Sequence, residues 1–576
     1  MKQAEIERQG SLPVSQANAH SKLNNNAEKH FGDWPNAAAF NNLEDTKDQI
    51  ELEISGHFPT HVAGTLCRTG PGAYKVPRSN SEDGHVTVDH WFDGFTTTHR
   101  FELTAGENGA CNKVFYSSYN QTDDMIDAAR RTGKLDGITF GQKRDPCDSF
   151  YKKFKAVFEP NLPDKSVTSI NIGVGFQETL PQDIKRAEHE SGKISGRRVI
   201  TTTTDNHATK TFDADTLEPL GVTRQDHLHP SLTGPLSCAH PAYDAETGHV
   251  FNYNIAFGAR QVYRVFRANT RTGDVEILAE IAGRDIKAAY IHSISMTDNF
   301  IVLCIWPAHF KGAGASLLWE RNLMDAMADF DPNAKAIWLV IDRRHGRGLV
   351  KKFESPAFFC FHTTNAWEQP SNDNENAIDI IWEACTFPNL DILHRLYYQN
   401  LVSTGPGASS FACRDSVKVS LTRYKLANIP ASKSKSSTIG KAQQLTSIPS
   451  PKAGDLPNIN PNYRRKPHRY VWSLIDQGKS SFNDSLGKTD TQTGECVRWE
   501  CYRHTPSEPI FLPLPGAVEE DEGHVLTVVF DGETGRSYLL CLDARTMREV
   551  GRAEVGKAVG IGFHGLHVPV GGGRVV

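Results

Sequence analysis

The sequence predicts an all-β protein, and within that class it favours a β-propeller over a β-sandwich. From about Asn41 onward, short runs rich in Val, Ile, Phe, Tyr and Trp are separated by Gly, Pro, Asn and Asp. Helical periodicity is rare, and strands do not alternate with helices as in parallel α/β folds. The 576 residues provide more chain than one sandwich needs, although no WD-like or kelch-like repeat is present.

Three segments carry the clearest strand signals. Residues 250–257 alternate apolar side chains with Asn and Ala, which is typical of a half-buried strand. Residues 336–353 read as a hairpin. Residues 524–555 contain two apolar runs joined by a Gly-containing turn and then a third run, which predicts an antiparallel meander.

Two segments have helical patterns. Residues 122–133 begin with a capping Thr and two acids and end with arginines before Gly133, as a short helix does. Residues 148–158 place aromatic and aliphatic side chains on one arc and lysines off it. Such a helix either packs on the protein core or lies at a membrane interface, and the pattern leaves both interpretations open.

The domain organisation follows from composition. Residues 1–40 lack an apolar run and are expected to be a disordered tail, and residues 41–576 are expected to form a single propeller domain. Residues 429–454 are rich in Ser, Lys and Pro, which predicts a flexible insertion loop within that domain.

Charge and cysteine content exclude several classes of protein. The net charge of −5 argues against a nucleic-acid partner. The eleven cysteines are scattered without a CxxC pair, which argues against a disulfide framework and favours a reducing compartment. No run approaches the roughly 18 apolar residues of a membrane span. We therefore expect a cytoplasmic protein whose membrane contact, if any, is peripheral.

Local sequence selects four of the 23 histidines as candidate metal ligands, because they lie in apolar or tightly turned settings. Their irregular separations place them on different elements, as when several blades of a propeller each lend a residue to a central axis. A buried histidine that is merely hydrogen-bonded in the core remains the alternative for each one, and His227 with His229 is a competing pair. The four candidates are His240, His292, His362 and His564.

The stretch GFHGLHVP at residues 562–569 contains two histidines three positions apart. Glycines and a proline make a helix improbable there and predict a strand end with a turn. Residues i and i+3 of a strand point to opposite faces, so we expect His567 to face away from any site that contains His564.

Four converging imidazoles would suit zinc, iron, copper or nickel, and ligand softness alone does not choose among these metals. Nitrogen ligands leave the charge of the metal uncompensated. We therefore expect nearby carboxylates to accept a hydrogen bond from the other nitrogen of each ring.

Around these histidines the sequence resembles the carotenoid cleavage oxygenase family of non-haem iron enzymes. The resemblance spans nearly the whole chain after the tail. It is carried by GTLCRTGPGAYKV (64–76), DHWFDGFTTTHRFEL (89–103), LSCAHPAYD (236–244), YIHSISMT, FHTTNAWE, EPIFLPLPGAVEEDEGHVLTVVFD (508–531) and GFHGLH.

The resemblance implies a seven-bladed β-propeller with a helical and loop cap over an axial Fe(II) held by the four histidines, His564 being the histidine of the FHG motif. It also implies carboxylate partners for the rings. Glu508 matches the partner of His564. Asp455 stands where relatives carry a glutamate as the presumed partner of His362. The third position falls in TTTTDNHATK, where we assign Thr204 as the residue opposite His292.

The activity that the resemblance implies is attack of O2 on a C=C bond of a lipophilic conjugated polyene, which gives two carbonyl fragments. Three further stretches are most similar to fungal members that cleave torulene or related carotenoids: residues 136–158, 224–237 and 319–348. Aromatic residues near the ligand motifs are candidates to line the substrate tunnel, although core packing is the alternative for each: Trp306, Phe361, Trp367 and Phe563.

Two other functions stay open. The same iron site could cleave a stilbene or another phenolic alkene, which would call for a Tyr and a Lys to hold the phenol. Alternatively, the propeller could be a non-catalytic binding scaffold with structural histidines.

Overall fold

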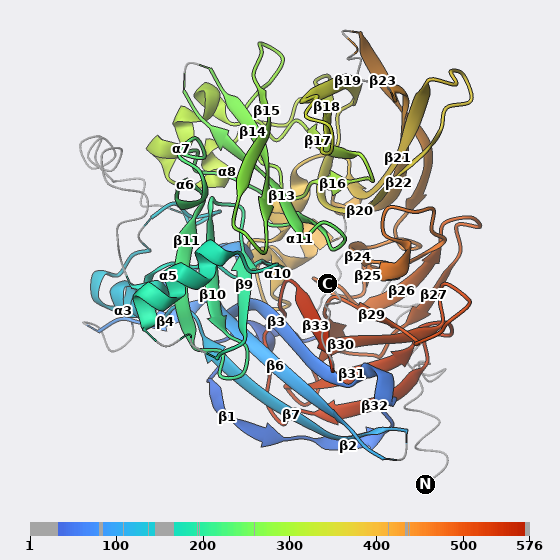
Figure 1. The fold of residues 1–576 in the computed structure, drawn as a ribbon. Coiled ribbons are helices and arrows are strands. Elements are labelled where there is room, and N and C mark those ends of the chain that lie inside the picture. Colours follow the sequence, from blue (N-terminus) through green and yellow to red (C-terminus); the bar gives the residue numbers. More distant parts are fainter. Residues whose placement is uncertain are drawn as a thin grey trace.

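The computed structural model describes residues 33–79, 84–107, 109–135, 137–143, 166–192, 194, 196–258, 260–412, 414–431, 436 and 438–570. Its sheets follow one another around a common centre in chain order (Figure 1). This propeller-like ring agrees with the all-β class predicted from the sequence. The amphipathic helix predicted over residues 148–158 lies outside the described residues.

The first sheet contains strands from both ends of the chain, in the order β1-β7-β6-β3-β33. Nearly every residue of β3 is buried, because the strand lies inside the sheet between β6 and β33. The antiparallel pairing of Cys67 in β3 with Leu566 in β33 closes the ring. The strands are β1 (Thr46–Glu51), β3 (Gly64–Ala73), β6 (Phe95–Ala105), β7 (Cys111–Asn120) and β33 (Gly565–Pro569).

Two four-stranded antiparallel sheets come next, and β13 confirms a strand over residues 250–257, although Asn252 and Asn254 are buried and the strand is not half-buried as predicted. One sheet comprises β8 (Gly175–Gln177), β9 (Val199–Thr203), β10 (Ala208–Asp213) and β11 (Pro219–Arg224). The other comprises β12 (Ala242–Asp244), β13 (His249–Ala256), β14 (Val262–Asn269) and β15 (Val275–Ile281).

An eight-stranded sheet follows, and its β18–β19 pair confirms the hairpin predicted over residues 336–353. It has two antiparallel halves, joined by parallel pairing of residues 352–354 in β19 with residues 439–441 in β23. One half is β16 (Ser295–Met296), β17 (Phe300–Ile305), β18 (Lys335–Asp342) and β19 (Leu349–Pro356). The other half is β20 (Phe359–Pro370), β21 (Ala377–Phe387), β22 (Ser420–Pro430) and β23 (Ile439–Pro449).

Two more sheets and a small ribbon complete the ring. The predicted meander over residues 524–555 is confirmed as β30, β31 and β32. The four-stranded sheet is β24 (Asp455–Asn458), β25 (Tyr470–Ile475), β26 (Ser485–Asp490) and β27 (Cys496–Trp499). The last sheet is β2 (Glu53–Gly56), β28 (His504–Pro506), β29 (Ile510–Pro513), β30 (Gly523–Asp531), β31 (Arg536–Asp543) and β32 (Glu549–Glu554), and the ribbon is β4 (Lys75–Pro77) with β5 (His85–Thr87).

The expectation of seven separate blades is not met by this arrangement. Among the described residues there are six sheets of four or more strands, because β19 and β23 pair and merge two four-stranded units. The mostly β, propeller-like arrangement is what the structure supports.

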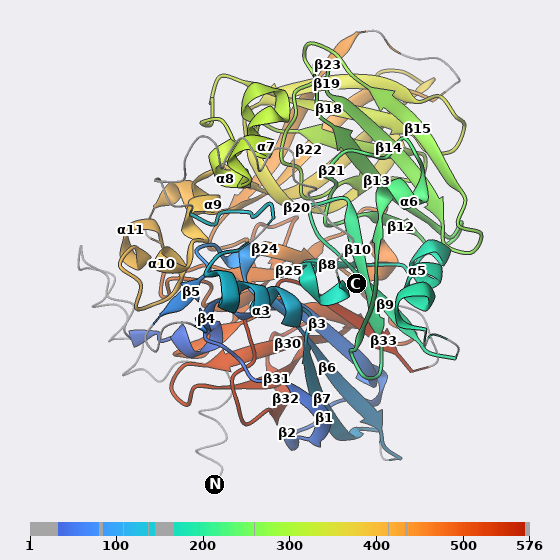
Figure 2. The same ribbon diagram turned by 90° about the vertical axis from the view of Figure 1, so that its left-hand side faces the viewer.

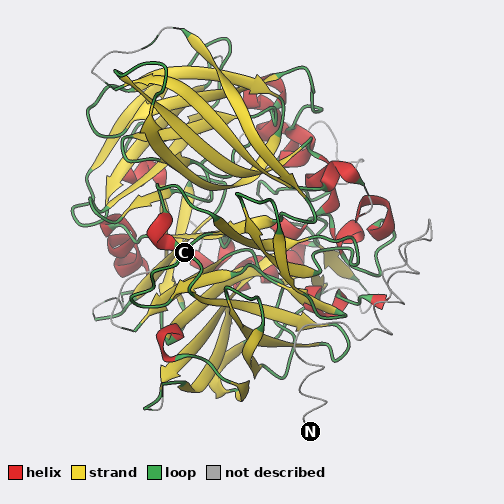
Figure 3. Ribbon diagram, turned by 90° about the vertical axis from the view of Figure 1, so that its right-hand side faces the viewer, coloured by secondary structure: helices red, strands yellow, loops and turns green. Residues whose placement is uncertain are grey.

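Helices are short, and α7 to α11 lie together on one side of the ring (Figures 2 and 3). The helix predicted over residues 122–133 is confirmed as α3, which ends at Gly133 in a left-handed conformation. No described helix has the length and apolar character needed to cross a bilayer. The helices are α3 (Asp123–Thr132), α5 (Pro181–Ser191), α6 (Gln225–Leu228), α7 (Ala315–Glu320), α8 (Leu323–Ala326), α9 (Asp391–Arg395), α10 (Tyr398–Leu401) and α11 (Ala408–Ala412).

Two sequence-based expectations about irregular segments are wrong in part. Residues 33–40 do not belong to a tail, because Trp34 and Phe40 are buried and the indole of Trp34 donates a hydrogen bond to the carbonyl of His504. Residues 429–454 are not simply a loop, because residues 439–449 form β23 along β22. Most β23 side chains are exposed, which explains why its composition resembles that of a loop.

Candidate metal centre

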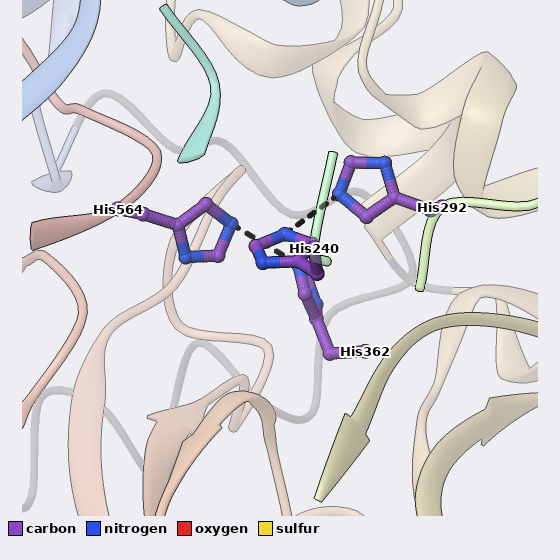
Figure 4. Close-up of side chains that lie close together, drawn as sticks. All are labelled: His240, His292, His362 and His564. Carbon is purple, nitrogen blue, oxygen red and sulfur yellow. Dashed lines mark hydrogen bonds between the residues drawn. The ribbon is translucent and has the colours of Figure 1, made fainter. Parts of the chain in front are cut away.

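The four histidines selected from the sequence meet at the centre of the ring. One ring nitrogen of each lies within 4.8 Å of the corresponding nitrogen of the others (Figure 4). The Nε2 atoms of His240 and His292 are 3.2 Å apart, as are those of His362 and His564. The predicted convergence is therefore present in the structure.

Each histidine comes from the inner edge of a different sheet or half-sheet. His362 lies in β20, and His564 immediately precedes β33. His240 and His292 lie two and three residues before β12 and β16, respectively. All four strands are edge strands, so they bring their ends to the common centre. The ring architecture thus explains why residues so distant in sequence form one cluster.

Carboxylates hold the second nitrogen, Nδ1, of three of the four rings. They come from sheets that do not supply the histidine in question, so the neighbouring sheets fix the ring orientations. The contacts are His292 Nδ1 to Asp205 Oδ1 at 2.8 Å, His362 Nδ1 to Asp455 Oδ1 at 2.7 Å, and His564 Nδ1 to Glu508 Oε1 at 2.7 Å. The structure places Asp455 and Glu508 where the sequence analysis expected them.

The expected role of Thr204 is wrong, because the residue beside His292 is Asp205. Strand β9 ends at Thr203, and the chain bends through the next two residues, so strand alternation cannot predict which side chain faces the centre. Tyr290 supports the carboxylate by donating from its hydroxyl to Asp205 Oδ2 at 2.9 Å. Within TTTTDNHATK, Asp205 is the residue that indicates the partner of His292, because a carboxylate is the usual partner of a metal-bound imidazole.

The carboxylates determine which ring nitrogen faces the centre as an acceptor. A carboxylate accepts a hydrogen bond from the N–H at Nδ1, so the Nε2 atoms of His362 and His564 carry lone pairs. Two lone pairs at 3.2 Å repel each other unless a cation lies between them. The donor set therefore fits a transition-metal ion better than it fits a hydrogen-bonded histidine core.

Glu508 is the most heavily supported of the three carboxylates. Its Oε2 accepts hydrogen bonds from the backbone N–H of Gly565 at 2.7 Å and from Arg68 Nη1 at 3.2 Å. Burial raises the pKa of Glu508 to about 7, and the charge of Arg68 acts in the opposite direction. A Cβ atom on Gly565 would lie 2.9 Å from Arg68 Nη1, so the glycine of the FHG motif leaves room for this arginine.

His240 differs from the other three histidines, because no carboxylate holds its ring among the described residues. Its backbone N–H donates to the carbonyl of His292 at 3.2 Å, which ties the two ligand segments together. Burial and the neighbouring imidazoles hold the pKa of His240 well below its usual value. The same causes lower the pKa of His564, so both rings are neutral and able to act as ligands.

An apolar cavity of about 80 Å³ borders the cluster. His292, His362 and His564 form part of its wall, and most of the remaining wall is aromatic or aliphatic. The ring of Phe92 stacks on His292 with a centroid separation of 6.3 Å, and Phe361 meets His292 edge-on at 5.5 Å. Such a wall suits an apolar ligand placed against the metal centre.

A second, larger cavity of about 1600 Å³, with a mixed polar and apolar lining, also reaches the cluster. His240, His362 and His564 line it, together with Arg464 and Arg465. His362 and His564 border both cavities, so the histidine cluster lies between the large mixed cavity and the small apolar one.

Two of the four predicted tunnel residues border the apolar cavity and two do not. Phe361 and Phe563 line it. Trp306 is fully buried and donates to the carbonyl of Tyr290, and Trp367 packs edge-on against His468. The sequence alone does not indicate which of these aromatic residues line the cavity and which pack in the core. Phe92, in the DHWFDGF motif, is a cavity residue that the sequence analysis did not single out.

The competing histidines lie outside the cluster. His227 belongs to helix α6, and His229 Nδ1 accepts from the N–H of Ser231, so they are not a pair on one strand face. His567 Nε2 lies 3.1 Å from the carbonyl of Val62 and does not join the four histidines, as predicted from the strand geometry.

A ring of β-sheets with four inward-facing imidazoles, three of them held by carboxylates, defines a class of protein with a non-haem metal centre. A model of the family described as "Retinal pigment epithelial membrane protein" matches residues 39–569. The chain therefore belongs to this family of carotenoid cleavage oxygenases, which is a family of non-haem iron enzymes.

Individual relatives agree with this assignment. The chain is 40% identical to a carotenoid dioxygenase of Neurospora crassa, over 94% of this chain and 92% of the relative. It is also 40% identical to a torulene dioxygenase of Gibberella fujikuroi, over 93% of this chain and 94% of the relative. A variant of the Synechocystis apocarotenoid oxygenase, 18% identical, has the same fold with a TM-score of 0.68 over 93% of this chain and 98% of that one.

Proposed function

We propose that the protein cleaves a C=C double bond of a carotenoid or apocarotenoid with O2 and releases two carbonyl fragments. The observation that carries this proposal is the cluster of four Nε2 atoms beside an apolar, aromatic cavity. The names of the two relatives at 40% identity support the substrate class. One O2 molecule supplies an oxygen atom for each new carbonyl group, so the reaction needs no further reductant.

The residues that would hold the metal are His240, His292, His362 and His564, and the proposed ion is Fe(II). Neutral imidazoles alone would also suit zinc, copper or nickel, and membership of a non-haem iron family selects iron. Bound Fe(II) would make O2 reactive toward an electron-rich double bond. Asp205, Asp455 and Glu508 keep the protons of their rings on Nδ1, which leaves Nε2 free to bind the ion.

The substrate is assigned to the apolar cavity. A hydrocarbon chain loses unfavourable contact with water when it lies against Phe92, Phe361 and Phe563, whereas the larger cavity would expose it to Arg464 and Arg465. A long polyene is larger than a cavity of about 80 Å³, so only a part of it that includes the scissile bond lies there. The aromatic walls position this segment and exclude water from it.

Two finer features of the architecture belong to the same proposal. If each half of the eight-stranded sheet counts as one blade, the ring has seven blades. In this description the helices α7 to α11 form part of a cap over the metal site.

A substrate as apolar as a carotenoid resides in lipid, so the enzyme would reach the bilayer through peripheral contact. Co-sedimentation with lipid vesicles tests that contact.

The decisive experiment joins metal analysis with substrate comparison. Protein purified without oxygen should contain iron or gain activity with Fe(II), and it should cleave β-carotene or torulene into two carbonyl products that mass spectrometry identifies. Cleavage of resveratrol alone would instead support a phenolic-alkene oxygenase. A protein without iron that also fails to respond to Fe(II) would support a binding scaffold.

A further inference from the structure

Four polar side chains other than the histidines line the apolar cavity. Three of them have partners among the described residues. Asp455 accepts from His362, and the side chains of Arg395 and Asp476 form an ion pair with a distance of 2.7 Å between Nη1 and Oδ2. The fourth, Asn483, makes no hydrogen bond with any residue that the structure describes. An amide in an apolar cavity loses free energy unless it finds a partner there.

The neighbouring ion pair offers one spare donor, whereas its carboxylate is already engaged by three donors. Asp476 accepts from Arg395 and from Lys418 Nζ at 2.7 Å through Oδ2, and from the backbone N–H of Gly478 at 2.8 Å through Oδ1. Arg395 directs Nε and Nη2 to the carbonyls of Ser481 and Phe482. A guanidinium has five N–H groups, so one N–H on Nη1 has no acceptor among the described residues.

A continuous set of aromatic rings connects the metal centre to Asn483. Phe92 stacks on His292, and the centroid of Phe563 lies 5.4 Å from that of Phe92. Trp91 follows at 4.6 Å from Phe563, and Phe482, the residue before Asn483, lies 5.1 Å from Trp91. A chain molecule that lies along these rings therefore reaches from the histidines to the amide.

We infer that Asn483 donates a hydrogen bond to the neutral carbonyl oxygen of a polyene aldehyde or ketone in this cavity, with Arg395 as a second donor. The inference rests on the proposed function and adds the chemistry of the group that binds away from the metal. A carbonyl oxygen is an acceptor only, which matches the donors of both side chains.

The charge balance favours a neutral ligand over a carboxylate. Arg395 and Lys418 both pair with Asp476, and the carboxylate of Asp484 lies close enough to Asp476 for the two charges to interact. Lys479 also interacts with Asp484 and pairs with Glu500 at 2.7 Å, so three cations face three carboxylates. Since no cation is left uncompensated, burial of a negatively charged ligand would cost desolvation free energy that no cation offsets.

The carbonyl could have two sources, and the reaction provides both. It could be the oxygenated end of an apocarotenal substrate, or it could be the carbonyl formed when the double bond is split. In the first case Asn483 determines which substrates bind. In the second case it retains one of the two products.

The test compares wild-type protein, Asn483→Leu and Asn483→Ser. Asn112→Leu serves as the matched control, because Asn112 is exposed on β7 and remote from the cavity lining. Steady-state KM and kcat are measured with β-carotene and with β-apo-8′-carotenal. Each carbonyl fragment isolated from the wild-type reaction is then added back as an inhibitor. Iron content and thermal unfolding show whether each variant is folded and loaded.

For Asn483→Leu we expect about a tenfold increase either in KM for the apocarotenal or in the inhibition constant of one product, as loss of a hydrogen bond predicts. KM for β-carotene should not increase, and Asn483→Ser should recover part of the effect. An increase in KM for the apocarotenal assigns the carbonyl to the substrate. An increase in the inhibition constant of one product assigns it to that product.

Equal effects on the hydrocarbon and on every carbonyl compound, or no effect on any of them, would overturn the inference while leaving the proposed cleavage intact. If neither polyene were cleaved by the iron-loaded wild-type protein, the proposed function would fail, and the role of Asn483 with it. If Asn483→Leu does not fold, Asn483→Ser decides by the same comparison.

Discussion

At the scale of single residues, the proton on each imidazole decides whether the cluster binds a metal. Asp455 contacts Nδ1 of His362, and that contact leaves Nε2 as the proposed ligand atom. Asp455 stands where relatives carry a glutamate, and it is one methylene shorter. It can still contact the ring, because it begins strand β24 and lies close to His362. The length of the aspartate side chain therefore suits the position of its strand, and its negative charge also contributes to holding the imidazole.

Replacing this carboxylate should weaken iron binding without removing a ligand. In Asp455→Asn, the amide loses the negative charge that stabilises the metal-bound imidazole, so we expect iron affinity to fall by about 10- to 100-fold. Competition with a chelator of known affinity measures the effect. Asp455→Glu restores the charge with a longer side chain and should retain more affinity than the amide. Equal affinity of Asp455→Asn and wild type would show that the contact has no influence on the metal.

Removing a ligand is a stronger perturbation. His362→Ala should lose its iron and reduce turnover by at least about 100-fold, because three histidines leave the ion with an incomplete donor set. The fold should persist, since the imidazole is only one part of the long strand β20. His345→Ala, on an exposed turn, is the control. Full activity in His362→Ala would contradict the ligand assignment.

The four histidines could be selected from the sequence, because apolar or turned surroundings are unusual for this residue. Their partners were harder to predict. The motifs predict Glu508 and Asp455, but they indicate Thr204 as the partner of His292, whereas the structure has Asp205 there. A bend at the end of β9 shifts the side chains by one position, and no periodic pattern records such a bend.

At the scale of strands, close backbone approach is what brings the ligand segments to the centre. Strand β8 passes beside the segment that contains His240. A Cβ atom on Gly175 would lie 2.9 Å from the carbonyl oxygen of Ala239 and 3.5 Å from Cε1 of His240. The absence of a side chain at Gly175 therefore allows β8 to approach a metal-ligand segment.

Gly175→Ala should consequently displace His240. Overpacking of this kind costs about 1–3 kcal/mol of unfolding free energy, and the shift of Ala239 should weaken iron binding by about tenfold. Gly283→Ala is the control, because its new methyl group would meet only the side chain of Asp285, at 2.6 Å, and Cγ1 of Ile286, at 3.4 Å. Chemical unfolding and chelator competition measure the two effects. Unchanged iron affinity in a destabilised Gly175→Ala protein would mean that β8 does not position the ligand.

Elements rich in apolar side chains were predictable, and exposed elements were not. The segments at 250–257, 336–353 and 524–555 carry apolar side chains that are buried in the core, so their patterns match strands β13, β18–β19 and β30–β32. Strand β23 has mainly exposed side chains and a Ser- and Lys-rich sequence. Its strand conformation comes from pairing with β22 and β19, which a local sequence pattern does not contain.

At the scale of the whole molecule, the two ends of the chain close the ring at the metal centre. Strand β33 follows His564 and pairs with β3, and β2 pairs with β32 in the last sheet. The same contacts bring Arg68 of β3 to Glu508, so ring closure and the setting of the last ligand depend on one another. Neither pairing can be deduced from local sequence, because the partners are separated by almost the full length of the chain. The resemblance to the family supplied the overall architecture.

The whole molecule also buries neutral histidines away from the metal, and these should govern its response to acid. Burial lowers the pKa of His90 and of His99 to about 3, and Lys557 and then Arg68 add to the effect at His99. Imidazoles have a pKa of about 6.5 in an unfolded chain. Between these values the unfolded chain binds more protons than the folded one, so stability rises with pH and is lost as the pH falls below about 6.5.

The iron-free protein should therefore lose stability steeply below about pH 6.5, by up to about 1.4 kcal/mol per pH unit for each such histidine. In His99→Gln the amide retains a partner for Tyr116, whose hydroxyl lies 2.9 Å from His99 Nδ1, but it does not titrate. Urea unfolding at several pH values should give the variant a slope that is shallower by about 1 kcal/mol per pH unit. Burial raises the pKa of Asp93 to about 6 and acts in the opposite sense, but equally in both proteins. Parallel slopes for variant and wild type would show that His99 takes up no proton on unfolding in this range.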